Sequence, residues 1–124
     1  MRHALNYKLS STAVFRCVND KLVLVELNGG EIFYFSPSAE SFLSFFRRAR
    51  SLSDYFEWVG LQKNSVEADY LISFCKFLLK KKILVKDPQL KERDTSVVKK
   101  ESYVRPQFFK KAAYTIDQVS FACP

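Results

Sequence analysis

Three strand-like segments precede three helix-like segments in this chain, and this order limits the folds that it can adopt. The first three segments are rich in β-branched and aromatic residues, which is typical of strands. The last three repeat apolar side chains every three to four positions, which indicates helices. The strand-like segments are Ala13–Val18, Leu22–Leu27 and Glu31–Phe35, and the helix-like segments are Pro37–Arg48, Leu52–Trp58 and Val66–Lys82. Residues 5–12 form a lead-in before the first strand, and a further short strand is expected at residues 83–85.

Turn and capping signals separate these segments. Asn19-Asp20 and Asn28-Gly29-Gly30 join the three strands, which predicts an antiparallel meander. We expect Ser36 to cap the first helix with Pro37 at its first position, and Ser51 to begin the second helix three residues before Asp54. Residues 64–67, Asn-Ser-Val-Glu, indicate a capping box for the third helix. A three-stranded antiparallel sheet followed by three helices predicts a winged helix-turn-helix with the wing placed first.

The third helix is apolar over more of its circumference than one core can use. At 100° per residue its apolar side chains span roughly 240°, whereas a surface helix needs a stripe only somewhat wider than about 100°. We therefore predict two apolar surfaces on it, one against the first two helices and one facing a groove beside the sheet edge. The first surface holds Leu71, Cys75, Leu78 and Leu79, and the second holds Tyr70, Phe74 and Phe77 with Lys81 on the same side. The alternative is that the C-terminal residues or a dimer partner cover the second surface.

Charge and residue types exclude several classes of function. The net charge of +7 favours an acidic partner, although the basic runs at 47–50 and 80–82 also suit helix ends. One histidine and three cysteines without a CxxC pair predict no metal site and no cofactor. No residue pair suggests nucleophilic or acid–base catalysis, so we expect no enzyme. The scattered cysteines suit the cytoplasm, and no segment suits a membrane span.

The composition changes after the last predicted helix and divides the chain into three parts. Residues 1–86 form the predicted domain. Residues 87–102 are polar and predict a flexible linker. Residues 103–124 are aromatic and apolar again, but without a sustained helical or strand period.

The stretch from Leu5 to Val85 resembles the PqqD-like family, the RiPP recognition elements of modified-peptide biosynthesis. The resemblance rests on the order of several pieces rather than on one of them. They are Val14–Arg16, Leu22–Phe33 with its Gly-Gly-Glu-Ile-Phe turn, Ser36–Ala39, Ala68-Asp69 and Phe77–Val85.

This resemblance implies a non-catalytic adaptor. Such domains bind the leader of a ribosomally made precursor peptide and present it to a modifying enzyme or a leader peptidase. The leader adds as an antiparallel strand to the third strand and lies against the third helix, and basic groups there suit acidic leader residues. The positions implied are Ile32, Phe33, Tyr34 and Phe35 on the strand, and Tyr70, Phe74, Phe77 and Lys81 on the helix.

Residues 103–108 are similar to the Tyr-x-x-Pro-x-Leu motif of leaders in lasso-peptide systems. Tyr103 and Pro106 match, whereas Phe108 replaces the usual Leu and Ala112 the usual Gly. We hypothesise that this tail is a leader-like segment that docks in the groove, in its own chain or in a neighbouring copy, which would make a homodimer by tail exchange. The alternative is an extension that packs elsewhere on the domain or stays disordered.

Two further functions remain open at this stage. A winged-helix DNA-binding protein fits the charge and the predicted topology. However, a recognition helix presents Arg, Lys, Asn or Gln to the bases, whereas Glu67 and Asp69 here would repel phosphate, so we expect no nucleic acid partner. The second open function is that of a subunit or dimerisation module, in which a partner permanently fills the groove.

Overall fold

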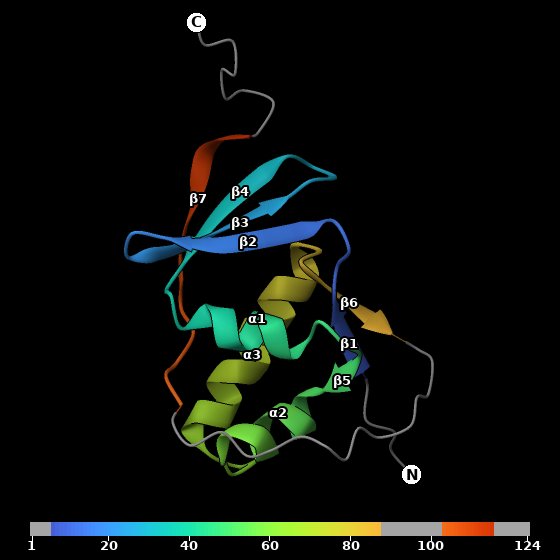
Figure 1. Cartoon of the computed structure of the whole chain (residues 1–124). Helices are drawn as coiled ribbons and strands as arrows, with labels where there is room; N and C mark the ends of the chain where they lie inside the picture. The colour runs from blue at the N-terminus through green and yellow to red at the C-terminus, as the bar shows by residue number, and fades with distance from the viewer. Residues whose placement is uncertain (1–5, 88–102, 116–124) are drawn as a thin grey trace, which may run out of the picture.

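Two antiparallel sheets and three helices make up residues 6–87 and 103–115, which are the residues described in this computed structural model (Figure 1). Residues 88–102 of the predicted linker, His3 and Cys123 lie outside the described residues. In chain order the elements are β1 (Asn6–Leu9), β2 (Ala13–Val18), β3 (Lys21–Glu26), β4 (Glu31–Phe35), α1 (Ala39–Phe45), β5 (Arg50–Ser51), α2 (Leu52–Val59), α3 (Val66–Lys80), β6 (Leu84–Asp87) and β7 (Phe108–Thr115).

The larger sheet has the strand order β2-β3-β4-β7, with every neighbouring pair antiparallel. Its first three strands form the predicted meander, and positive φ values at Asn19 (57°) and Gly30 (71°) allow the two tight turns. The predicted bounds of the middle strand are one residue late at both ends. The fourth strand, β7, comes from the C-terminal residues and was not predicted as a strand.

A second, smaller sheet has the order β5-β1-β6. Its central strand β1 is the lead-in before the predicted meander, and it pairs along its whole length with β6, from Asn6 opposite Asp87 to Leu9 opposite Leu84. Strand β6 covers Leu84–Asp87, so it begins one residue later and ends two residues later than the strand expected at residues 83–85. Figure 1 shows this sheet beside α2, away from the larger sheet.

Four helix bounds differ from the prediction: both ends of α1, and the C-terminal ends of α2, at Val59, and of α3. Helix α1 covers Ala39–Phe45 rather than residues 37–48, because Ser38 stands at the N-cap and Phe46 at the C-cap. Helix α2 has the capping box expected from Ser51 and Asp54, with hydrogen bonds of 3.1 Å in both directions. Helix α3 ends at Lys80, two residues early, since Lys82 turns to a φ of 64°.

The predicted capping box at α3 is wrong in its second half. The Ser65 side chain does accept from the backbone N–H of Ala68, at 3.1 Å. Residue 68 is therefore the third helical position, so Glu67 cannot reach back to complete the box. Its carboxylate instead contacts Tyr103 and Arg105.

The core lies between one face of the larger sheet and the helices beneath it (Figure 1). Alternate residues of β3 and β4 face inward, and Leu22, Leu24, Phe33 and Phe35 are fully buried. Aromatic rings meet them from the helices: Phe74 packs edge-on against Phe35 and against Phe42, with centroid separations of 6.0 and 5.2 Å. None of the helices in the described residues is both long and apolar enough to cross a membrane.

Candidate functional site

Strand β7 occupies the edge of β4 that the meander leaves unpaired. The two strands run antiparallel, with Phe108 opposite Phe35 and Thr115 opposite Glu31, and the ladder shifts register twice between these ends. Residues 103–107 lead into β7 along α3 and the start of α1 (Figure 1). We call residues 103–115 the tail segment. We call the β4 edge, together with Glu67, Tyr70 and Phe77 of α3, the β4–α3 surface.

Phe108 anchors the tail segment between the strand and the helix. Its ring centroid lies 5.4 Å from that of Phe35 and 6.3 Å from that of Phe33 on β4. On the helix side the Phe77 ring lies 4.6 Å away. Contacts of this kind add roughly 0.5–1.5 kcal/mol per ring pair to the gain from burial. Phe108 therefore contacts both elements that form the surface.

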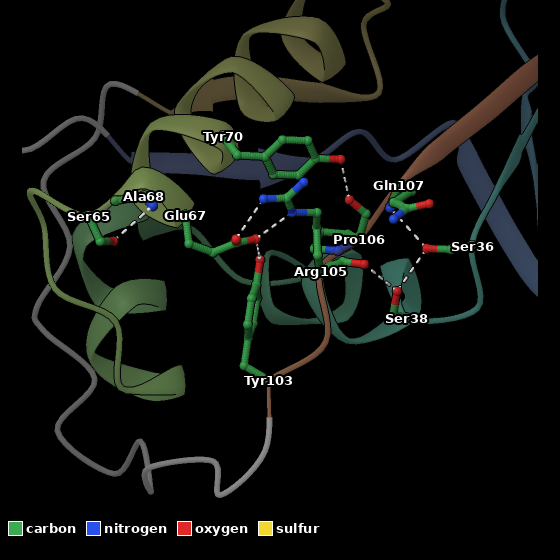
Figure 2. Close-up of polar contacts among 10 residues, drawn as sticks. All are labelled: Ser36, Ser38, Ser65, Glu67, Ala68, Tyr70, Tyr103, Arg105, Pro106 and Gln107. Atoms are coloured by element: carbon green, nitrogen blue, oxygen red, sulfur yellow. Dashed lines mark hydrogen bonds and ion pairs between the residues drawn. The ribbon is translucent and has the colours of Figure 1, made fainter.

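Glu67 receives two side chains of the tail segment (Figure 2). The Tyr103 hydroxyl donates to Oε2 at 2.6 Å. The Arg105 guanidinium donates from Nε to Oε2 and from Nη2 to Oε1, both at 2.8 Å. This paired arrangement matches the planar fork of arginine to the two carboxylate oxygens.

Tyr70 holds the next part of the tail segment. Its hydroxyl donates to the backbone carbonyl of Pro106, whose side chain is buried. The Arg105 guanidinium lies 4.2 Å from the centre of the Tyr70 ring, within cation–π range. Tyr70 thus contacts the tail segment at two groups, the backbone carbonyl of Pro106 and the guanidinium of Arg105.

The residues before α1 also bind the tail segment, rather than capping the helix as predicted for Ser36. Gln107 N–H donates to the Ser36 hydroxyl at 2.9 Å, and Ser36 N–H donates to the Gln107 carbonyl at 2.7 Å. The Ser38 hydroxyl donates to the Arg105 carbonyl at 2.7 Å (Figure 2). Ser38 makes no side-chain hydrogen bond to its own helix. These hydroxyls extend the strand-like backbone pairing beyond the end of β4.

Further contacts follow along β7. Lys111 forms an ion pair with Glu31 at 2.6 Å, and Ala112, where the leader motif expects Gly, is 7% exposed. Lys110 lies 5.8 Å from the centre of the Tyr34 ring, and Lys21 approaches the same ring at 5.3 Å. The two lysines thus attach β7 to β4 differently, Lys111 through an ion pair and Lys110 through a cation–π contact.

Binding of the tail segment changes the acidity of the groups around Glu67. The hydrogen bonds from Arg105 are the main cause of a lowered pKa for the Glu67 carboxyl, and Tyr103 adds to the effect. Burial raises the pKa of the Tyr103 hydroxyl, and its hydrogen bond to the carboxylate raises it further. Burial also raises the pKa of the Tyr70 hydroxyl. At neutral pH the site therefore holds an ionised glutamate and two protonated tyrosines.

The residues expected at the site lie in different environments. Phe33, Phe35, Tyr70 and Phe77 contact the tail segment. Phe74 is 5% exposed and packs in the core, stacked on Tyr70 with 6.0 Å between ring centroids. Ile32 is 7% exposed, Tyr34 contacts the cation of Lys110, and Lys81 lies 5.9 Å from the centre of the Phe77 ring.

Sequence reasoning missed Glu31, Ser36, Ser38 and Glu67 of the domain and Arg105 of the tail segment. Ser36 and Glu67 were missed because each had a sufficient local explanation as a helix-capping residue. Among the described residues no cluster of three or more His, Cys, Asp or Glu side chains could hold a metal ion. Searches of protein-family models, curated proteins and solved structures gave no match to this chain.

Proposed function

We propose that this protein is a non-catalytic, cytoplasmic adaptor that binds the leader segment of a precursor peptide on the β4–α3 surface. The leader adds as an antiparallel strand to β4 and is presented to a modifying enzyme or a leader peptidase. The proposal includes a winged helix-turn-helix fold, with the β2–β3–β4 meander as the wing. The order of strands and helices supports that fold.

One observation carries this proposal: the chain's own tail segment, with Tyr103, Pro106 and Phe108 at leader-like spacing, already lies on this surface. Strand addition supplies backbone hydrogen bonds that any peptide can make, and side-chain contacts select among peptides. Phe108 provides an apolar side-chain contact and Tyr103 a polar one, and Pro106 contributes a buried ring and a backbone carbonyl that accepts from Tyr70. The surface therefore has both components of a peptide-binding site.

In this proposal the tail segment acts as an internal ligand. A covalently attached ligand acts at a high effective concentration, in the millimolar range for a short connection. A separate leader has to displace the tail segment, so a peptide with low affinity for the β4–α3 surface does not bind in competition with it. The same contacts made between two copies would give a homodimer by tail exchange.

A peptide titration tests the proposal. The full-length chain carries Tyr103→Ala, Pro106→Ala and Phe108→Ala, which removes tail anchors and leaves the core and the β4–α3 surface intact. A labelled peptide of residues 103–115 is titrated into it and followed by fluorescence anisotropy. We expect saturable binding, which the unsubstituted chain shows only at much higher protein concentration because its surface is occupied.

A peptide carrying the same three alanines is the matched control and should not bind. Equal binding of both peptides, or of neither, would contradict the proposal. A labelled DNA duplex is run in parallel. Duplex binding that weakens steeply with salt, together with no peptide binding, would favour a nucleic acid partner instead.

A further inference from the structure

One carboxylate on α3 contacts two separate side chains of the bound strand. Glu67 accepts one hydrogen bond from Tyr103 and two from Arg105. In an extended chain, residues two apart point to the same side. Val104, between them, is 66% exposed and points away from the domain. The β4–α3 surface thus contacts Tyr103 and Arg105 and leaves Val104, between them, without a contact to Glu67.

The geometry at Arg105 favours arginine over lysine. Its guanidinium uses two donors toward Glu67 while its flat face lies over the Tyr70 ring. A lysine ammonium is a point charge that cannot make this paired contact and stack in the same way. The side chain of Glu67 is 22% exposed, so the bound peptide replaces much of the water around its carboxylate.

The position of Tyr103 adds a second requirement. Its hydroxyl is hydrogen-bonded to Glu67, and a phenylalanine would fill the same space without a donor. Without the hydroxyl, Glu67 Oε2 keeps only the hydrogen bond from Arg105 Nε, and this partly shielded oxygen loses a donor that water replaces incompletely. Sites built around such a bond therefore reject analogues that lack the hydrogen-bonding group.

We propose that Glu67 is the specificity-determining residue of the β4–α3 surface and selects peptides with the pattern Tyr-x-Arg. This inference rests on the proposed function and narrows its partner. The preferred leader is basic and aromatic at this point, although the overall charge of +7 favours acidic partners. The local charge outweighs the net charge in selecting the peptide, because the Arg105–Glu67 ion pair is 2.8 Å long. This distance is much shorter than the Debye length of about 8 Å, over which salt screens charges.

A double-mutant cycle tests the inference in the same full-length, tail-substituted chain. Glu67→Gln keeps the size of the side chain and removes its charge. Asp69→Asn is the matched control, because Asp69 is an exposed acid of the same helical turn. Each protein is titrated with the 103–115 peptide and with its Tyr103→Phe, Arg105→Lys and Arg105→Ala versions.

We expect Glu67→Gln to weaken binding of the unsubstituted peptide by on the order of tenfold, the lower end of what a hydrogen bond to a charged group contributes. Glu67→Gln should weaken binding of the Arg105→Ala peptide much less. Asp69→Asn should have little effect on the binding of any of the peptides. Arg105→Lys should lose most of the affinity that Arg105→Ala loses.

Additive losses, or equal losses for Glu67→Gln and Asp69→Asn, would overturn the inference. In that case the peptides still bind and the adaptor function stands. Absence of binding for every peptide would contradict the proposed function itself, and the inference with it.

Discussion

Phe108 and Phe35 lie directly opposite each other across the β4–β7 ladder, with 5.4 Å between their ring centroids. Phe35 is fully buried in the domain core, whereas Phe108 belongs to the tail segment. Because Phe108 also contacts Phe77, a single side chain of the tail meets both the sheet and α3. The attachment of the tail should therefore depend on this residue more than on its neighbours.

Phe108→Ala should release the tail segment without unfolding the domain. Removal of a fully buried Phe costs roughly 3–5 kcal/mol, and the partly buried Phe108 should cost less than that. Hydrogen exchange checks this: backbone amides of β7 should exchange much faster, whereas those of α2 should keep their protection. Val104→Ala is the control, because Val104 is 66% exposed. Unchanged exchange in β7 would show that backbone pairing alone holds the tail.

Two phenylalanines one turn apart on α3 should behave differently. Phe74 is 5% exposed among Phe35, Phe42 and Tyr70, so Phe74→Ala should lower the free energy of unfolding by about 3–5 kcal/mol. Phe77 lies partly exposed against Phe108, so Phe77→Ala should mainly weaken tail binding. Denaturant unfolding and peptide titration of both variants separate the two effects. Equal effects in both assays would contradict this division of roles.

Attachment of the tail segment should weaken in acid. The ion pair with Arg105 lowers the Glu67 pKa below its ordinary value of 4.5. Its contribution is therefore complete above about that pH and is lost as the pH falls through the lowered value. Backbone amide shifts of Arg105 and of residues 107–112, followed by NMR from pH 6 to pH 2.5, should report this release. In Glu67→Gln the acid-dependent step should disappear, and a persistent step would assign it to another group.

Tyr70→Phe should weaken the tail attachment by about 1 kcal/mol, the net worth of one neutral hydrogen bond. The substitution removes the donor to the Pro106 carbonyl but keeps the ring that lies on Phe74 and beneath Arg105. Competition between the tail and the labelled 103–115 peptide measures the change. Tyr70→Ala should have a larger effect, because it also removes the ring. If Tyr70→Phe is silent, water satisfies the Pro106 carbonyl equally well.

The thiol of Cys75 should be unreactive in the folded protein. It is 2% exposed, and burial raises its pKa to about 12, so little thiolate is present at neutral pH. In a Cys17→Ser/Cys123→Ser chain, iodoacetamide should label Cys75 only after denaturant unfolds the protein. Labelling at the rate of a free thiol under native conditions would mean that α3 opens readily from the core.

Local sequence signals predicted the elements whose causes are local. Asn19 and Gly30 mark the turns of the meander because tight turns need residues that tolerate positive φ. Ser51 and Asp54 lie three residues apart, so their capping box can be recognised without knowing the rest of the fold. The excess apolar surface of α3 likewise indicated that something covers it. For these features the interacting groups are neighbours along the chain.

The occupant of that surface was decided by contacts between residues far apart in sequence. Strand β7 has no sustained alternation, and its register on β4 shifts twice, so its pairing is set by Phe108 and by ion pairs such as Lys111–Glu31. Ser36 and Glu67 carry ordinary capping signals, yet their side chains bind residues 103–107. A polar side chain can satisfy a nearby helix end or a distant strand equally well. The sequence alone determined the meander and the second apolar side of α3, whereas the tertiary structure decided which segment covers that side.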